Sequence, residues 1–316
     1  MYSVGLDLGG TWTKAALVAP DGRMLAHRRT PTAAGREPEA VFASLREELE
    51  AMAREAGLLY PPPLGCGLGV PGVVEASRGW LRLSGPLGWR DVDLAAVASR
   101  ALGCDVAADN DVNAGALADL WFGEGQGSQD MLYITWGTGI GAAFVVGRTL
   151  YHSRGAAMGN FGHMPADPSS SRLCYCGCTG CLEIEAGGKA MVEQVGERLA
   201  SGEPSILTGS PEPLTPECIA TAALSGDALA RRVLDRCTVL MARALAGVLA
   251  FLNPDTVVFG GGVSRCFPLV QQTFDRELRL RTPSFSLPLT RVLQSRFGDS
   301  AGVVGASLLP KNKVTR

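Results

Sequence analysis

Four side chains of types that bind metals are clustered near the middle of the sequence. His163 is followed by Cys174, Cys176 and Cys181. One imidazole and three thiolates are ligands that structural Zn²⁺ prefers, and in a cytosolic chain clustered cysteines favour metal binding over disulfides. We therefore predict a structural zinc site here, with an inert cluster of buried thiols as the alternative. Cys178 is a surplus thiol that either competes as a ligand or stays free.

A second group of residues could transfer a proton. The segment 109–114 has the sequence Asp-Asn-Asp-Val-Asn-Ala and precedes an Ala-rich stretch that is typical of a helix. Asp111 is therefore predicted at or near a helix N-terminus. A helix cap is one role for an aspartate there. The other is a general base that accepts a proton from a hydroxyl attacking a γ-phosphate, and these residues alone leave both roles open.

Two glycine-rich segments could bind phosphate. In the segment 7–11, Asp7 precedes Gly9, Gly10 and Thr11. Glycines let backbone N–H groups approach an anion closely, and Asp7 could hold Mg²⁺ through water. An ordinary tight turn with a solvated aspartate is the alternative. The segment 137–141, Gly-Thr-Gly-Ile-Gly, is a second loop of this kind, without the spacing of a dinucleotide-binding motif or a Walker A loop.

A third glycine element, Gly260-Gly261-Gly262, follows the apolar residues 256–259. A glycine turn after a strand allows close approach of a flat nucleoside. Together with the two loops at 7–11 and 137–141, this element is suited to a nucleoside triphosphate.

The elements that must position these residues alternate between strands and helices. Apolar runs predict strands at 4–8, 15–18, 64–70 and 256–259, the first two forming a hairpin with a glycine turn. Helical periodicity predicts a helix from Pro38 to Ala56 and a long helix through Leu240, Leu245 and Leu249. This alternation predicts an α/β fold.

The chain also contains an internal repeat. Residues 132–146 repeat the opening pattern of apolar strand, glycine turn and second apolar strand, with Thr135 at the position of Asp7. The repeat predicts two similar lobes, each beginning with a glycine-tipped hairpin. A chance resemblance between two glycine hairpins is the alternative.

Length and composition exclude several classes of protein. The 316 residues are 46% hydrophobic and 19% charged with a net charge of -2, as in globular proteins with a sizeable core and unlike nucleic-acid binders, which need a basic surface. The start lacks the basic and apolar regions of a secretory signal. The apolar stretch 131–147 is interrupted by glycines, and the long helical run that ends near Leu252 carries several arginines and an aspartate. We expect a cytoplasmic protein with no membrane or nucleic-acid partner.

Taken together, these motifs resemble the ROK family of bacterial repressors, open-reading-frame proteins and sugar kinases, particularly its glucokinase-like members. The resemblance covers nearly the whole chain. Besides the glycine loops and the cysteine run closing with Cys181-Leu182-Glu183, it rests on Gly69-Val70-Pro71-Gly72, Leu87-Gly88-Trp89, Asn110-Asp111-Val112-Asn113 and Gly162-His163.

The resemblance implies an actin-like (ribonuclease H-like), duplicated two-lobed sugar kinase fold with a cleft between the lobes. We predict a small lobe at residues 1–113, joined by about 300–316, and a large lobe at 114–299 with the nucleotide site and the zinc motif. Family members are commonly homodimers, so we expect a homodimer.

The resemblance also implies the reaction, an ATP- and Mg²⁺-dependent phosphorylation of the 6-hydroxyl of a hexose or amino-hexose with Asp111 as the catalytic base. His163 would then bind zinc through one ring nitrogen and lie near the sugar with the other. The predicted sugar-binding residues are Gly72, Asn110, Asp111, Asn160, His163 and Glu183. The predicted residues for the phosphates and the nucleotide are Asp7, Gly9, Gly10, Thr11, Thr13, Lys14, Thr138, Gly139, Gly261 and Gly262.

Two residues depart from the family pattern. Asn160 stands where kinases of the family usually have glutamate, and Gly85 stands where many have asparagine. An amide donates as well as accepts, whereas a carboxylate only accepts. We therefore expect an amino sugar such as kanosamine or glucosamine, with glucose as the second candidate; a shifted alignment or compensation by neighbouring residues is the alternative explanation.

Two other classes of function compete with a kinase. ROK repressors share the sugar fold and the zinc motif and carry an N-terminal helix-turn-helix domain, for which the seven residues up to Asp7 leave no room. A catalytically silent sugar sensor is the third class. The presence of Asp7, Asp111 and both phosphate loops favours the kinase.

Overall fold

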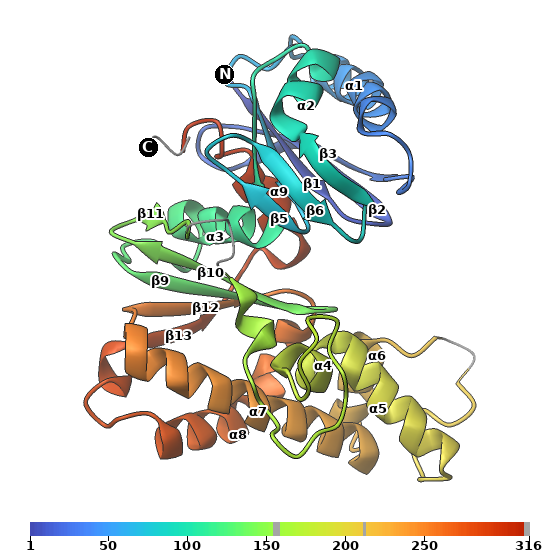
Figure 1. Ribbon diagram of the computed structural model, residues 1–316, viewed down its shortest axis with the longest axis vertical. Helices are drawn as coiled ribbons and strands as arrows, with labels where there is room; N and C mark the ends of the chain where they lie inside the picture. Colours follow the sequence, from blue (N-terminus) through green and yellow to red (C-terminus); the bar gives the residue numbers. More distant parts are fainter. Residues whose placement is uncertain (154–158, 211–212, 313–316) are drawn as a thin grey trace. The chain divides into compact units, whose positions relative to one another are not determined.

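The computed structural model describes residues 1–153, 159–210 and 213–312, and strands and helices alternate along the chain (Figure 1). Contacts group the described residues into two compact units. The first unit contains 1–129, 143–153 and 295–312, and the second contains 130–142, 159–210 and 213–294. The contacts thus place 114–129 and 143–153 with the first unit, although the sequence prediction ended the small lobe at residue 113.

The first unit is built on a five-stranded sheet. Its strand order is β3-β2-β1-β4-β8, with β1 antiparallel to β2, β2 antiparallel to β3, and parallel pairing of β1 with β4 and of β4 with β8. The strands span Ser3–Leu8 (β1), Trp12–Val18 (β2), Met24–Pro31 (β3), Cys66–Val70 (β4) and Val106–Asn110 (β8). The predicted hairpin is therefore β1 and β2, and the predicted strand 64–70 is β4.

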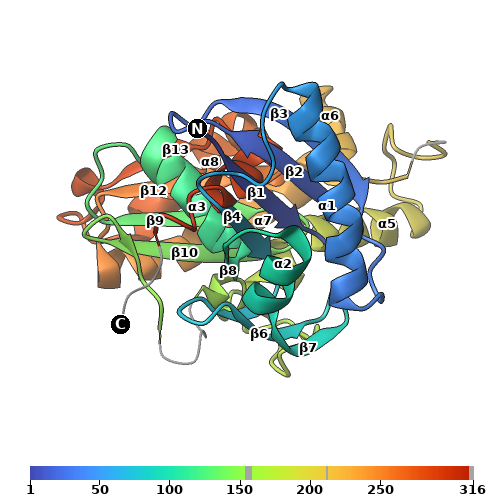
Figure 2. The same ribbon diagram turned by 90° about the horizontal axis from the view of Figure 1, so that it is seen from above.

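Helices cover both faces of this sheet (Figure 2). Alternation along β2 shows the two faces, because Ala15 and Leu17 belong to the core under α1 and α2, whereas Ala16 and Val18 pack with α3 and α9. The helices span Pro38–Glu55 (α1), Leu94–Leu102 (α2), Asp111–Phe122 (α3) and Ala301–Ala306 (α9). The predicted helix 38–56 is α1, and it buries Val41, Phe42, Leu45, Leu49 and Met52.

Helix α9 can pack closely on the first sheet because small residues line the contact. A Cβ atom on Gly5 of β1 would lie 1.9 Å from the carbonyl oxygen of Val303, and one on Gly305 would lie 1.7 Å from that of Ala114 in α3. The last of the described helices therefore packs directly on the sheet that contains the first strand.

A separate antiparallel sheet in this unit has the order β5-β6-β7, from Val73–Glu75 (β5), Trp80–Ser84 (β6) and Trp89–Asp93 (β7).

A second five-stranded sheet repeats the order of the first. It runs β11-β10-β9-β12-β13, with β12 parallel to both β9 and β13. Its strands span Met131–Trp136 (β9), Ile140–Val146 (β10), Thr149–Leu150 (β11), Thr256–Gly260 (β12) and Arg291–Gln294 (β13). The shared order confirms the internal repeat predicted from residues 132–146.

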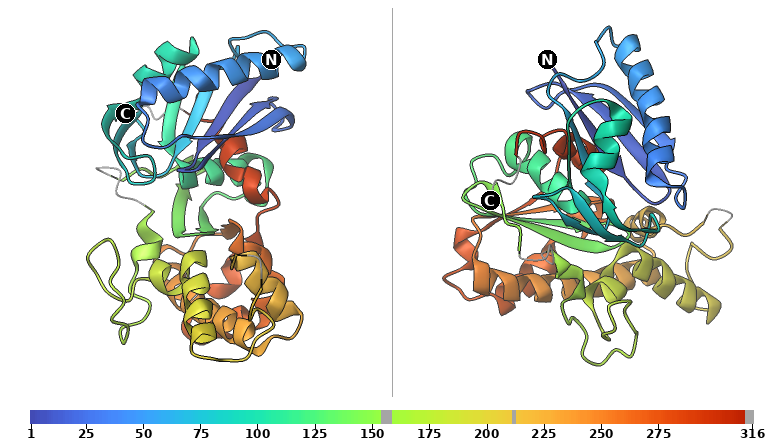
Figure 3. Two further views of the ribbon diagram at one scale, coloured as in Figure 1. Left: turned by 90° about the vertical axis from the view of Figure 1, so that its right-hand side faces the viewer. Right: turned by 45° about the horizontal axis from the view of Figure 1, so that its top comes forward.

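Helices account for most of the remainder of the second unit (Figure 3). The longest, α7, begins after Asp227, whose carboxylate accepts from the N–H of Ala230, and ends at Asn253 in a left-handed conformation. None of the described helices is long and apolar enough to cross a membrane. The α-helices are Leu182–Ala186 (α4), Gly188–Ala200 (α5), Pro216–Leu224 (α6), Ala228–Leu252 (α7) and Phe267–Arg281 (α8). The short 3₁₀ helices are Asn160–His163 (η2), Val263–Cys266 (η3) and Leu287–Leu289 (η4), with Gly298–Ser300 (η5) in the first unit.

Candidate functional site

Asp111 is the first residue of helix α3, directly after the carboxyl end of β8. Asn110 is the helix cap, since its Oδ1 accepts from the N–H of Val112 at 2.8 Å. The cap role considered for Asp111 therefore belongs to its neighbour. Asp111 Oδ1 also accepts from the Val112 N–H, at 3.0 Å, so the carboxylate lies folded back over the first turn of the helix.

The surroundings of Asp111 raise the pKa of its carboxyl group. Burial, followed by the negative charge of Asp7, raises the pKa of Asp111 to about 6, while the backbone N–H of Val112 acts in the opposite direction. At neutral pH this group is mostly ionised, yet it binds a proton more readily than an exposed aspartate. A carboxylate with these properties is suited to accepting a proton from a hydroxyl group.

Asp7 lies near the carboxyl end of β1 and faces a lysine. Its Oδ2 is 3.8 Å from Lys14 Nζ, which also donates to the carbonyl oxygen of Asp299 at 2.7 Å. Burial raises the pKa of Asp7, whereas the charge of Lys14 lowers it. A Cβ on Gly302 would lie 2.7 Å from Asp7 Oδ2, so the glycine leaves room for the carboxylate. Asp7 is close enough to Asp111 for its negative charge to raise the pKa of Asp111, and a carboxylate such as Asp7 is a ligand type that Mg²⁺ prefers.

The predicted phosphate loop at 9–11 forms the turn between β1 and β2. Gly9 donates its N–H to the carbonyl oxygen of Trp12 at 3.0 Å, and a Cβ on Gly10 would lie 2.9 Å from the carbonyl oxygen of Pro86. Thr11 is exposed, but Thr13 is fully buried and its hydroxyl lies 2.8 Å from that of Thr32. The Thr13 side chain therefore points into the protein interior, where it contacts Thr32 and stabilises the loop.

Gly72 connects β4 and β5 beside the start of α3. Its φ is 129°, and a Cβ there would lie 2.1 Å from the carbonyl oxygen of Leu83, so only glycine fits. The carbonyl oxygen of Gly72 accepts from Asn110 Nδ2 at 3.0 Å. Gly85 follows β6 in the same unit, and a Cβ at this position would meet no atom within 4 Å.

In the second unit the four predicted metal ligands converge. The ligand atoms of His163, Cys174, Cys176 and Cys181 all lie within 4.8 Å of one another. His163 Nδ1 is 3.4 Å from Cys174 Sγ, and the Sγ atoms of Cys176 and Cys181 are 3.6 Å apart. Tetrahedral zinc with Zn–S bonds of about 2.3 Å and Zn–N bonds of about 2.0–2.1 Å separates its ligand atoms by about 3.5–3.8 Å. The donor set and its spacing fit zinc.

Glu183 lies on α4, two residues after the last cysteine, and its side chain reaches the second glycine loop. Its Oε2 accepts from the N–H of Ile140 at 2.7 Å, and a Cβ on Gly139 would lie 2.4 Å from the same oxygen. On the other side of the loop, Lys189 donates its N–H to the carbonyl oxygen of Thr138 at 3.0 Å. The loop is thus fixed by α4 and by the start of α5.

A glycine turn after β12 lies against this loop. Gly261 has a φ of 86°, and a Cβ there would lie 2.6 Å from the carbonyl oxygen of Trp136. A Cβ on Gly262 would lie 3.0 Å from Glu217 Oε1. Two glycine turns therefore come together in the second unit, one after β9 and one after β12.

Asn160 is the first residue of η2, the short helix that ends at the proposed ligand His163. Asn160 is exposed. A Cβ on Gly162 would lie 2.2 Å from the carbonyl oxygen of Ile140, so η2 lies tightly against β10. The structure thus brings Asn160, His163 and Glu183 to the same part of the second unit.

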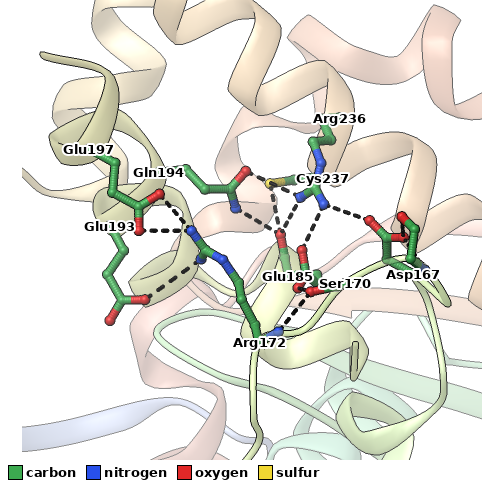
Figure 4. A network of polar contacts seen from close by, with 10 residues as sticks. Asp167, Ser170, Arg172, Glu185, Glu193, Gln194, Glu197, Arg236 and Cys237 are labelled. Atoms are coloured by element: carbon green, nitrogen blue, oxygen red, sulfur yellow. Dashed lines mark hydrogen bonds and ion pairs between the residues drawn. The ribbon is translucent and has the colours of Figure 1, made fainter. Parts of the chain in front are cut away.

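A charged network holds the cysteine-rich segment, which has little regular secondary structure (Figure 4). Arg236 of α7 donates to Asp167 Oδ2 at 2.9 Å and to Glu185 Oε2 at 2.7 Å. Glu185 is 1% exposed and also accepts from the Ser170 hydroxyl at 2.5 Å. Ser170 Oγ in turn accepts from the N–H of Arg172 at 3.1 Å. The network fixes the segment on both sides of the cysteines.

Sequence patterns predicted neither the Arg236–Glu185 ion pair nor a second ion pair in the first unit, between His152 and Asp109. Glu185 and Arg236 are 51 positions apart, and Asp109 and His152 are 43 positions apart, so no local spacing relates them. The turn that supports Thr138 could have been found, since Gly187-Gly188 is a glycine pair before a helix.

Comparisons with known proteins agree with this architecture. The ROK family matches residues 3–313. The glucokinase of Thermotoga maritima is 31% identical over 320 residues, covering 98% of this chain and 98% of that protein. A ROK family glucokinase from Streptomyces griseus, solved with glucose and AMPPNP, has a TM-score of 0.80 at 28% identity and covers 98% of this chain and 99% of its own.

A regulatory protein is also similar in structure. The ROK family transcriptional regulator described as a homologue of the Escherichia coli MLC protein has a TM-score of 0.87 at 26% identity, covering 99% of this chain and 78% of its own.

The fold is the actin-like, duplicated two-lobed fold of sugar kinases. The chain belongs to the ROK family and resembles its glucokinase-like members.

Proposed function

We propose that this protein transfers the γ-phosphoryl group of ATP to the 6-hydroxyl of a hexose or amino-hexose. The observation that supports this most is Asp111, a carboxylate with a pKa raised to about 6 at the start of α3 and near Asp7. The similarity to glucokinases over nearly the full chain supports the same reaction.

In the proposed mechanism Asp111 accepts the proton of the attacking hydroxyl. Asn110 holds the helix start through the Val112 N–H and contacts the sugar with its remaining polar capacity. Asp7 would hold Mg²⁺, which would offset negative charge on the phosphates. The loops at 9–11 and 137–141 donate backbone N–H groups to the phosphates, and Lys14 adds a positive charge.

The second unit contributes sugar and nucleotide contacts in this proposal. His163 and Glu183 bind sugar hydroxyls, and the glycines at 261 and 262 let the nucleoside approach. His163 and the three cysteines would hold zinc, which would supply no step of the reaction but would fix the orientation of the imidazole. The remaining exposed residue of this group, Asn160, contacts the sugar ring.

We further propose an amino sugar of the glucosamine or kanosamine type as the substrate, with glucose as the second candidate. Asn160 presents an amide and Gly85 presents no side chain, at two positions where the resemblance to the family leads us to expect glutamate and asparagine. An amide can donate to a hydroxyl oxygen or to an unprotonated amine, which a carboxylate cannot do. The hydroxyl pattern recognised on the sugar is therefore expected to differ from that of a glucokinase.

A sugar-responsive regulator without catalysis is the second candidate function. Its support is the similarity to the ROK regulator with a TM-score of 0.87. The proposed base, Asp111, and the ion pair of Asp7 with Lys14 favour the kinase, because a sensor needs no proton acceptor beside a phosphate loop.

Release of ADP from Mg-ATP by the purified protein tests these proposals. The sugars to compare are glucose, mannose, fructose, glucosamine, N-acetylmannosamine and kanosamine. Faster turnover on an amino sugar than on glucose supports the full proposal, whereas a wide preference for glucose contradicts the amino-sugar part. Sugar binding by calorimetry without turnover on any of these sugars supports the regulator.

A further inference from the structure

Asp109 is a buried carboxylate next to the proposed catalytic segment, and the mechanism above does not use it. Its residue is 2% exposed. One carboxylate oxygen, Oδ1, accepts from the N–H of Asn110 at 2.7 Å and from Asn113 Nδ2 at 2.9 Å. These two partners flank Asp111 and Val112 on either side in sequence. Asp109 therefore binds the chain just before and just after the start of α3.

His152 holds the other oxygen of Asp109. Its Nε2 lies 2.7 Å from Asp109 Oδ2, and its side chain is 18% exposed. The imidazole also has a hydrogen bond with the backbone of Leu150, at the end of β11. An imidazole that donates from both ring nitrogens is doubly protonated, because the neutral ring has only one N–H. The contacts therefore favour an imidazolium bridging Leu150 and Asp109.

We propose that the Asp109–His152 pair positions Asp111 for catalysis. His152 fixes the plane of the Asp109 carboxylate, and Asp109 then fixes the Asn110 backbone and the Asn113 side chain around Asp111. His152 touches neither the sugar nor ATP in this proposal and is a positioning residue. The inference rests on the proposed kinase function, although the pairing itself is testable without activity.

Electrostatics give the pair a dependence on pH. Burial lowers the pKa of His152, but the hydrogen bond and the negative charge of Asp109 outweigh it, so the pKa is raised from 6.5. Asp109 is the charged group facing the ring among the described residues, and Leu150 supplies the other contact. As pH rises through the pKa of His152, one of the two donated hydrogen bonds is lost.

Replacing His152 in the intact protein tests this role. His152→Gln keeps one amide donor but no charge, and we expect kcat to fall about 10-fold with KM for the sugar within twofold. His152→Leu removes both donors and should approach the loss of about 100-fold that a 1 Å misplacement can cause. The wild-type decline of kcat at alkaline pH should be absent in both variants.

A matched control variant accompanies the kinetic test, and its outcomes separate failure of the positioning role from failure of the kinase function. His27 is an exposed histidine on β3, and His27→Gln should leave kcat and its pH profile unchanged. Wild-type kcat and an unchanged alkaline limb in both His152 variants would overturn the proposal. Absence of turnover by the wild-type protein on every sugar would instead contradict the kinase function, and the pair would be decided by titration alone.

Titration of the histidine rings by NMR tests the pair in the native protein. The chain has three histidines, so signals are assigned with His27→Gln and His152→Gln. We expect His152 to titrate above the ordinary range for a histidine, and Asp109→Asn to lower the pKa of His152. A His152 signal whose titration is unchanged by Asp109→Asn would show that the two side chains do not form this pair.

Discussion

The two five-stranded sheets have the same strand order, but the residues at their hairpin turns differ in charge. Near the end of β1, Asp7 forms an ion pair with Lys14 and repels Asp111. At the corresponding position near the end of β9 stands Thr135, and the nearby loop is held by Glu183, a residue of α4 that accepts from the N–H of Ile140.

This difference indicates how the duplicated fold divides its tasks. The first sheet places carboxylates of its own strand and helix ends where a cation and a proton can bind. The second sheet presents backbone N–H and carbonyl groups and depends on other elements to hold its loop. We therefore expect substitutions at the first turn to affect the chemical step, and those at the second to affect binding and stability.

The largest expected effect is that of Asp111→Asn. Loss of a positioned base typically lowers kcat by about 10²- to 10⁴-fold. Asparagine can still accept from the Val112 N–H, so the thermal midpoint should stay close to that of the wild type. Steady-state kinetics measure kcat and thermal melting measures the midpoint. The control is Asp105→Asn, which replaces an exposed aspartate. Near-normal turnover in Asp111→Asn would contradict the assignment of the base.

The next effect is expected from Asp7→Asn. Losing a carboxylate that holds Mg²⁺ through water should raise the apparent Mg²⁺ requirement by about 10- to 100-fold, by analogy with outer-shell metal partners. Mg²⁺ titrations of ADP release measure it. Thr135→Ser, at the matching position of the second sheet, should change the requirement little. If the two substitutions raised the apparent Mg²⁺ requirement equally, the proposed difference between the two sheets would be wrong.

The pH profile gives an independent test of the same two carboxylates. Because the pKa of Asp111 is raised to about 6, kcat should fall as pH drops through about 6, where the base becomes protonated. Asp7 contributes to that raised pKa, so Asp7→Asn should move the acidic limb to lower pH. An acidic limb that stays in place in Asp7→Asn would show that the two groups do not interact.

Arg236→Met tests whether the second unit depends on side chains outside its loops. The change leaves the buried Glu185 without its cationic partner, and the free energy of unfolding should fall by about 1–3 kcal/mol. The cysteine-rich segment should also release zinc to a chelator faster. Denaturant unfolding and a colorimetric zinc assay measure both. The control Arg232→Met removes an exposed arginine of the same helix. Adding Glu185→Leu to Arg236→Met should recover part of the stability.

The smallest expected effect is that of Glu183→Gln. The amide oxygen still accepts from the Ile140 N–H, so the loop should keep its conformation. Replacing a charged acceptor by a neutral one weakens a hydrogen bond by about 1 kcal/mol, which predicts a rise of about fivefold in KM for the sugar. A large fall in kcat with unchanged KM would place Glu183 in the chemical step instead.

The sequence predicted features in which the interacting residues lie close together in the chain. The predicted zinc ligands fall within one short segment, and the start of α3 follows from Asn110, a preferred cap residue. Both hairpins follow from apolar runs around glycines. The shared strand order was predictable only because the two hairpins have similar patterns.

Other features depend on residues that only the fold brings together. Lys14 donates to the carbonyl oxygen of Asp299, 285 positions away, and Arg236 reaches Glu185 across 51 positions. A threonine in a glycine-rich turn suggests phosphate binding, yet Thr13 points into the interior to Thr32, because alternation along β2 turns it inward. Residue type alone does not distinguish such a buried hydroxyl from an exposed one.

The most direct test of the central claim is to identify the product of the reaction by NMR. After incubation with Mg-ATP and the preferred sugar, the account predicts a phosphate monoester whose ³¹P signal is coupled to the two protons on carbon 6, formed by the wild type and nearly absent with Asp111→Asn. Phosphate on another carbon, or sugar binding without any phosphorylated product, would contradict it.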